Sequence, residues 1–141
     1  MSRVINPNAV GKERDLLVKA IVVALRELAQ QSAIGEETRD LAAFVALSLE
    51  SIAETIDLSV QAWEKRGYWV KADRFRMDWI WTGQYGKELK EALWGENWAQ
   101  VAMLTAKIGG KLGTVKIPVR NRIGRPWVGA WKKLEANGTP G

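Results

Sequence analysis

The feature that most constrains the fold is a long stretch, from Glu36 to Arg66, that contains neither glycine nor proline. Apolar side chains recur along it at spacings of four and three residues, which is the period of an amphipathic helix. These side chains are Leu41, Val45, Leu49, Ile52, Ile56, Val60 and Trp63. Gly67 follows directly, where a left-handed residue commonly ends a helix. The pattern predicts a helix over about 36–66, roughly 45 Å long, which serves as a spine for other helices or as a seam between subunits.

The same three-and-four spacing predicts helices on both sides of this central helix. Pro7 suits the first turn of a helix, because proline lacks the amide hydrogen that would be unpaired there. Gly83 and Gly86 lie on the apolar stripe of the third helix, so we expect them to allow the close approach of another backbone. The predicted spans are about 7–32, 70–95 and 97–112.

Residues 114–125 have a different character, because Val115, Ile117 and Val119 alternate with polar residues or proline in the period of an extended chain. A single short strand has no partner in an otherwise helical chain. We therefore expect a strap across the bundle, or a strand that pairs only between subunits. Pro126 is expected to open a short C-terminal helix. The predicted fold is an all-α bundle of four to five helices, one domain over 1–136, with a flexible tail at 137–141.

The chain has 141 residues and contains neither cysteine nor histidine. This composition excludes disulfides, thiolate nucleophiles and cysteine zinc sites. It also excludes histidine as a general base and, with it, a Ser-His-Asp triad. The glycine-containing segments lack the spacing of a phosphate-binding loop. We therefore expect no enzyme activity, no metal site and no cofactor.

Positive charge is concentrated toward the C-terminal end. Residues 107–141 hold eight basic side chains and one acidic side chain, Glu135, in a chain whose net charge is +5. Such an asymmetry predicts a polyanionic partner, which is a nucleic acid, an anionic membrane or an acidic protein surface. A solvated basic edge without any partner gives the same pattern.

Two tryptophans are interleaved with bases in the sequence RPWVGAWKK, at residues 125–133. Aromatic rings in such a setting stack on nucleobases while the charges hold phosphates; a helix at a membrane interface has a similar composition. The alternative that we favour is that Trp127 and Trp131 dock the last helix on the bundle, which still leaves a basic surface on that helix. The candidate binding residues are Lys116, Arg120, Arg122, Arg125, Trp127, Trp131, Lys132 and Lys133.

The other tryptophans divide into two groups. Trp63, Trp79 and Trp98 lie on predicted apolar stripes, so we expect them to pack in the core. Trp81 lies about 160° around the third helix from Trp79, given 100° per residue, and Trp94 lies near a helix end. These two residues contact another helix, a second subunit or a ligand, and the sequence does not choose among these roles.

Acidic residues of the central helix form the pattern EExxD, then thirteen residues, then ExxD. This pattern resembles the magnesium-binding motifs of the all-α nucleoside triphosphate pyrophosphatases, the MazG and dimeric dUTPase superfamily. The resemblance covers about twenty-two residues and implies that Mg²⁺, which prefers oxygen ligands, is held against substrate phosphates. The residues it implies as ligands are Glu37, Asp40, Glu54 and Asp57.

The predicted geometry argues against this magnesium site. Neither glycine nor proline lies between Leu41 and Ala53, so both acidic motifs fall on one continuous helix. Glu37 and Glu54 are then roughly 25 Å apart along its axis. The second motif also falls on the side of the helix where a solvated face is expected.

The chain begins without the apolar core of a signal peptide and has no apolar stretch long enough to span a bilayer, which predicts a cytoplasmic protein. Our leading hypothesis is a small non-enzymatic binding protein whose basic C-terminal third contacts a nucleic acid, with little sequence specificity, or another acidic partner. One alternative is a structural subunit of a homo- or hetero-oligomer that assembles through helical faces containing Val22, Val23 and Trp81. The other is a pyrophosphatase-like enzyme.

Overall fold

A computed structural model describes residues 7–137 of the chain, with the side chains of residues 9–137. The expected tail therefore lies outside the described residues, except for Asn137. The described part is an all-α bundle and contains no strand, which confirms the predicted fold class. Its five helices are α1 Pro7–Ala29, α2 Glu36–Lys65, α3 Trp69–Trp94, α4 Trp98–Lys111 and α5 Ala130–Ala136.

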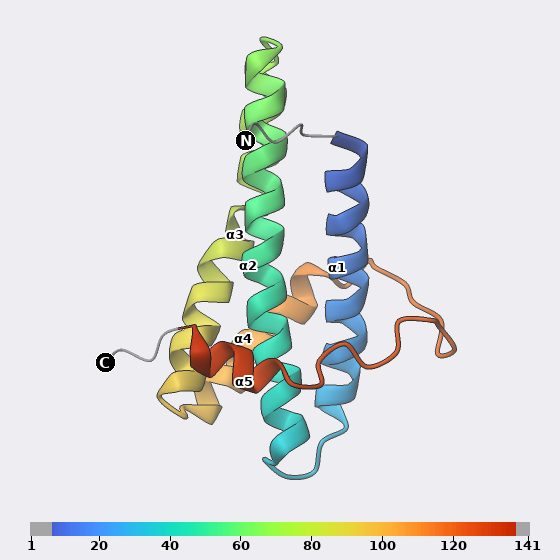
Figure 1. The fold of residues 1–141 in the computed structure, drawn as a ribbon, viewed down its shortest axis with the longest axis vertical. Coiled ribbons are helices and arrows are strands. Elements are labelled where there is room, and N and C mark those ends of the chain that lie inside the picture. The colour runs from blue at the N-terminus through green and yellow to red at the C-terminus, as the bar shows by residue number, and fades with distance from the viewer. Residues whose placement is uncertain (1–6, 138–141) are drawn as a thin grey trace.

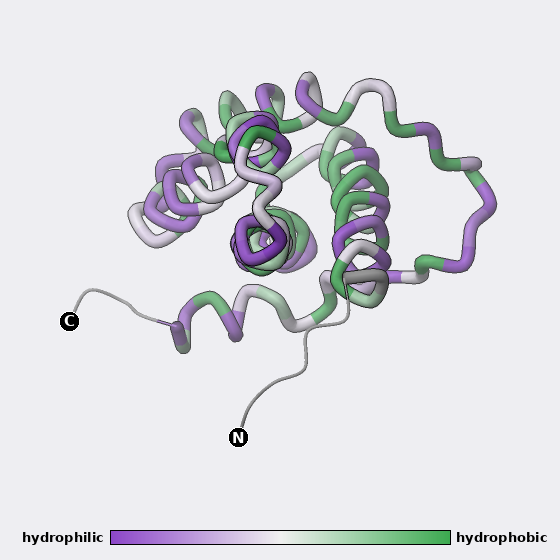
Figure 2. The backbone as a smooth tube through the Cα atoms, turned by 90° about the horizontal axis from the view of Figure 1, so that it is seen from above, coloured by the Kyte–Doolittle hydropathy of each residue, from purple (hydrophilic) through white to green (hydrophobic). Residues whose placement is uncertain are grey.

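The first three helices run down, up and down as neighbours in the view of Figure 1, with α2 between α1 and α3. Helix α4 packs against α3 and α1, and the short α5 crosses the opposite face of the bundle, where it contacts α2. The view from above shows the segment between α4 and α5 passing around the outside of α1 (Figure 2). Helix α4 and the following segment therefore pass on two sides of α1 before α5 packs against α2.

Helix α2 is the central element, as its long uninterrupted pattern predicts. Six of the seven predicted core residues are buried, and Trp63, the last of them, is half-buried. The helix ends at Lys65, and Gly67 adopts the left-handed conformation (φ +80°) that the sequence predicts for this position. The stripe is widened by small buried residues, Ala42, Ala43 and Ala46. Both α1 and α3 pack against α2.

Helices α3 and α2 approach each other closely at Gly86. A Cβ atom at this position would lie 3.2 Å from the Cβ of Leu49 and 3.4 Å from the backbone oxygen of Ala46. The prediction that this glycine permits close packing is therefore confirmed. A Cβ at Gly83 would lie 3.6 Å from the Cβ of Ala53, an ordinary contact, so this position does not require glycine.

Four expectations about individual positions are wrong. The C-terminal helix begins at Ala130 and not at Pro126, because residues 126–129 form a turn in which Gly129 is left-handed (φ +85°). Trp81, expected to be part of an unused apolar face, is buried within this chain, and its ring stacks on that of Trp79. Val23, expected to be unused apolar surface, is buried within this chain. Helix α1 also ends at Ala29, before the predicted end.

Candidate functional site

The candidate site is the C-terminal segment, defined here as residues 114–137. Its first part is an extended strap, as predicted, which runs outside α1 (Figure 2). The Arg26 guanidinium of α1 donates hydrogen bonds to the backbone oxygens of Ile117 (2.8 Å) and Pro118 (3.5 Å). Farther along, the Asn121 side chain donates to the oxygen of Pro118 and accepts from the amide of Ile123. The strap is therefore fixed to α1 at one point and folded on itself at its outer bend.

Two acidic side chains of α2 hold the second part of the segment. The Arg125 guanidinium lies 2.6 Å from a carboxylate oxygen of Glu37. The Asp40 carboxylate accepts hydrogen bonds from the backbone amides of Gly129 (3.2 Å) and Trp131 (3.0 Å). Because these amides are among the first of α5 and have no partner within that helix, Asp40 acts as its N-terminal cap from another element.

The tryptophans of the segment are packed against the bundle. Trp127 is 2% exposed and belongs to the hydrophobic core, and its indole N–H has no hydrogen-bond partner among the described residues. Trp131 is half-buried, and the Arg39 guanidinium lies 5.6 Å from its ring centre and 5.5 Å from that of Trp98. The docking interpretation of this pair agrees with the structure. Trp127 has no exposed ring on which a nucleobase could stack.

The basic side chains of the segment, in contrast, point into solvent. Five of them are exposed and form no ion pair with the described residues: Lys116, Arg120, Arg122, Lys132 and Lys133. Arg125 is also exposed but is paired with Glu37. They lie on the strap that passes α1 and on α5, which crosses in front of α2 (Figure 1). The segment therefore carries a row of five cations that no ion pair of the described residues neutralises.

The first acidic motif of α2 forms contacts within the chain, and the second is exposed. Glu37 and Asp40 bind the C-terminal segment, whereas Glu54 and Asp57 are exposed on the same continuous helix. Among residues 9–137, no group of three or more acidic side chains is placed to hold a metal ion. The four side chains that the magnesium motif implies are thus not brought together in this chain.

A groove between the end of α1, the following loop and α4 has a volume of about 600 Å³. Its lining contains no charged side chain and includes Leu25, Leu28, Ile34, Trp98 and Val101. Such a surface suits an apolar group. Its lining offers no carboxylate, amine or guanidinium that could act as an acid or a base.

A comparison of the chain with protein-family models, with curated proteins and with solved structures finds no significant match. The chemistry of its surfaces is therefore the basis for a functional assignment. Among residues 7–137, no helix combines the length and the apolar character that a membrane span requires.

A second surface was missed by the sequence analysis, at the turn between α2 and α3. Tyr68, Trp69 and Val70 are all exposed there, next to the left-handed Gly67. We call these three residues, with the exposed bases Lys65, Arg66 and Lys71, the hairpin tip. The signal that could have identified it is the run KRGYWVK, in which two aromatic residues and a valine follow a helix-ending glycine.

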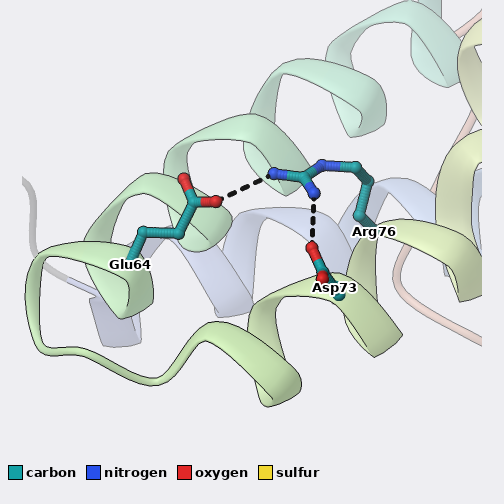
Figure 3. Close-up of polar contacts among 3 residues, drawn as sticks. All are labelled: Glu64, Asp73 and Arg76. Carbon is teal, nitrogen blue, oxygen red and sulfur yellow. Dashed lines mark hydrogen bonds and ion pairs between the residues drawn. The ribbon is translucent and has the colours of Figure 1, made fainter.

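The hairpin is braced immediately below this tip. The Arg76 guanidinium of α3 contacts the carboxylates of Glu64 (3.1 Å) on α2 and Asp73 (2.8 Å) on α3 (Figure 3). The hydrogen bond with Glu64 and the charge of both acids raise the pKa of Arg76. The rings of Trp63 and Phe75 meet edge to face, with their centres 4.8 Å apart.

Helix α1 contributes one further brace to the hairpin. The Arg14 guanidinium lies over the ring of Phe75, 4.8 Å from its centre, and donates a hydrogen bond to the Ser59 hydroxyl. Burial lowers the pKa of Arg14. The contacts join α1, α2 and α3 at one level, so the tip projects from a firmly packed base.

Proposed function

We propose that the chain is a non-enzymatic binding protein whose C-terminal segment contacts the phosphate backbone of a nucleic acid. The observation that carries the proposal is the row of five exposed basic side chains without acidic partners, at 116–133. Arg120 and Arg122 stand on the strap, and Lys132 and Lys133 stand on α5. Glu37 is paired with Arg125, and the segment itself contains one acid, Glu135, so positive charge is in excess along the row.

The structure supports contact with phosphates more than the reading of bases. Trp127 lies in the core and Trp131 packs beside Arg39, so neither ring stands free among the cations. Contacts of lysine and arginine with phosphates position a protein but carry no sequence information. We therefore expect similar affinity for oligonucleotides of different sequence. We also expect this affinity to fall steeply with salt, because binding releases condensed counterions.

The proposal is tested by the fluorescence anisotropy of labelled single-stranded and duplex oligonucleotides at several salt concentrations. A variant that carries Arg120→Gln, Arg122→Gln, Lys132→Gln and Lys133→Gln should bind duplex DNA more weakly. Its slope of log affinity against log salt should be smaller by up to about four, since each lost phosphate contact removes about 0.9. Arg125 is left unchanged in this variant because its pair with Glu37 contributes to docking.

The matched control is the variant Lys12→Gln with Lys19→Gln, which removes two exposed bases from α1. It should bind like the unchanged protein. Equal affinity of the four-residue variant and the unchanged protein would overturn the proposal. Competition by polyglutamate, with no binding of any oligonucleotide, would assign the segment to an acidic protein partner instead.

The other hypotheses are tested with the same protein. Sedimentation at several concentrations measures self-association, which the structural-subunit alternative requires. Val23 and Trp81 give that alternative no support, because both are buried within the chain. Incubation with nucleoside triphosphates and Mg²⁺ tests the pyrophosphatase-like alternative. Cytoplasmic localisation stays a prediction.

A further inference from the structure

We propose that the hairpin tip, together with the outer face of the first turns of α3, docks on an anionic lipid bilayer. This surface is separate from the C-terminal segment and does not depend on the function proposed for it. The tip stands beyond the end of α1, whereas the strap and α5 cross the other half of the molecule (Figure 1).

The tip is apolar as well as exposed. Trp69 is 60% and Val70 69% exposed, although aromatic and aliphatic side chains are usually covered in a folded protein. Farther along α3, Met77 is 75% exposed and Ile80 is also exposed. Val70, Met77 and Ile80 are seven and three residues apart, so they lie on one side of the helix. Asp73 lies on the same side and is paired with Arg76; around it, the apolar side chains extend the apolar surface of the tip along about 15 Å of helix.

The charge around this apolar surface is positive. Lys65, Arg66, Lys71 and Arg74 are exposed and have no acidic partner among the described residues. Of the acids nearby, Glu64 and Asp73 are both bound by Arg76. Asp78 is the one acid between residues 64 and 80 that no ion pair of the described residues neutralises. The tip and the first turns of α3 therefore carry four cations without an acidic partner among the described residues, against one unpaired anion, Asp78.

The composition and shape of the tip favour a bilayer over the other polyanions. Tryptophan and tyrosine have an apolar body and a polar edge, which places them at the boundary between headgroups and hydrocarbon. Aliphatic side chains such as Val70, Met77 and Ile80 enter that boundary but give nothing to a nucleobase, on which only flat rings stack. The tip is also the convex end of a helical hairpin (Figure 1). A convex apolar surface rimmed by cations matches a fluid anionic surface.

The braced base of the hairpin makes this proposal testable by substitution. The contacts of Arg76 with Glu64, and of Phe75 with Trp63, lie below the tip and use none of its apolar side chains. Replacement of the exposed side chains should therefore leave the fold intact. Lys71 is kept unchanged in all variants, because its ammonium group packs over the ring of Trp63.

The experiment is co-sedimentation of the full chain with phosphatidylcholine vesicles, with and without phosphatidylserine. The unchanged protein should bind the vesicles that contain phosphatidylserine and bind pure phosphatidylcholine at least tenfold more weakly. The variant Trp69→Ser with Val70→Ser and Met77→Ser should lose this binding about tenfold or more. The variant Lys65→Gln with Arg66→Gln and Arg74→Gln should bind both kinds of vesicle equally weakly. Circular dichroism confirms that each variant is folded.

Two controls test whether exposed apolar side chains, or basic side chains, elsewhere on the molecule contribute to vesicle binding. Leu16→Ser with Val119→Ser removes exposed apolar side chains from α1 and from the strap and should bind like the unchanged protein. The four-residue variant of the C-terminal segment should also keep vesicle binding. Failure of the nucleic-acid proposal and failure of the bilayer proposal therefore give different results.

Trp69 supplies a spectroscopic signature that a structural effect would not produce. It is the single tryptophan of the eight that is exposed, so its emission should shift to shorter wavelength when the tip enters the interface. Trp69→Phe should abolish this shift while co-sedimentation persists, because phenylalanine keeps the apolar contact.

Several results would overturn the proposal. It fails if the chain binds neither vesicle, or binds both equally. It fails if the C-terminal variant loses vesicle binding while the tip variants keep it. Loss of oligonucleotide binding in the tip variants, without any effect on vesicles, would assign the tip to nucleic acid. Loss of self-association alone in these variants would assign it to a second copy of the chain.

Discussion

Two segments of this molecule have nearly the same composition, but one packs a tryptophan into the core and the other exposes its tryptophan to solvent. RPWVGAWKK at 125–133 and KRGYWVK at 65–71 each contain two aromatic residues, one valine, one glycine and three bases. The glycine is left-handed in both, with φ of +85° at Gly129 and +80° at Gly67. Yet Trp127 is buried and Trp69 is exposed. Composition and local backbone shape therefore do not decide whether an aromatic residue is structural or available to a partner.

The difference lies in what surrounds each segment. The C-terminal segment passes over the face of α2, where Glu37 and Asp40 hold its backbone and its arginine. The hairpin tip extends past α1, and its nearest acids are bound by Arg76. An aromatic–basic run becomes part of the core where unpaired acids and an apolar surface meet it, and stays in solvent where neither is present.

The largest expected effect comes from truncation of the buried ring. Trp127→Ala should lower the free energy of unfolding by about 3–5 kcal/mol, because it leaves a cavity in the core. Trp127→Phe should cost much less, since it keeps most of the ring and removes an N–H that has no partner. Urea denaturation followed by circular dichroism measures both. A loss below about 1 kcal/mol for alanine would show that the segment is not part of the cooperative fold.

The second effect concerns the packing that holds the hairpin below its tip. Gly86→Ala should destabilise the fold by about 1–3 kcal/mol, because the added methyl group would press on Leu49 and on the backbone of α2. Gly83→Ala is the matched control and should be neutral or stabilise by up to about 1 kcal/mol, since alanine favours helix and fits there. Thermal unfolding of the pair gives the comparison directly. Equal effects at the two positions would contradict the close approach of α2 and α3.

A smaller effect is expected at the cap of α5. Asp40→Ala should cost about 1 kcal/mol, the usual value of a lost N-terminal cap. The amides of Gly129 and Trp131 should then exchange faster with solvent, which hydrogen exchange measures residue by residue. Asp57→Ala serves as control, because Asp57 is exposed on the same helix. If both substitutions leave these amides equally protected, Asp40 does not hold α5.

The smallest effect on stability is expected at the exposed ring. Trp69→Ala should change the free energy of unfolding by no more than about 0.5 kcal/mol, as is usual for a surface position. The same substitution should remove most of the fluorescence that acrylamide quenches readily. A large loss of stability here would erase the contrast between the two segments.

Much of the fold was predictable because its signals are local. The uninterrupted pattern of α2, the left-handed Gly67 and the close approach at Gly86 each depend on a few neighbouring residues. The role of Trp81 stayed open because a single stripe assumes one neighbour, whereas α3 packs against both α2 and α4. The start of α5 was misjudged because its cap, Asp40, lies on another helix.

The candidate site was predictable only in part, for a related reason. The density of cations in the C-terminal third is visible in the sequence, and it identified the basic residues that are candidates for binding. Which of them stay free depends on Glu37, an acid almost ninety residues earlier. The hairpin tip escaped notice because exposure is a property of the finished arrangement of α1 and the hairpin, not of the run KRGYWVK itself.

The contacts that hold the C-terminal segment against the bundle have a consequence for the order in which the parts of the chain fold. Arg26 meets Ile117, and Asp40 meets Trp131, each across 91 positions of chain. Contacts of such long range close late in folding, because the intervening chain must first be confined. On a ribosome, the helices up to α4 are made before residues 115–137 emerge. The site that Trp127 fills in the core therefore stays open until the residues after α4 have been made, and the segment that closes the bundle is made after the helices on which it packs.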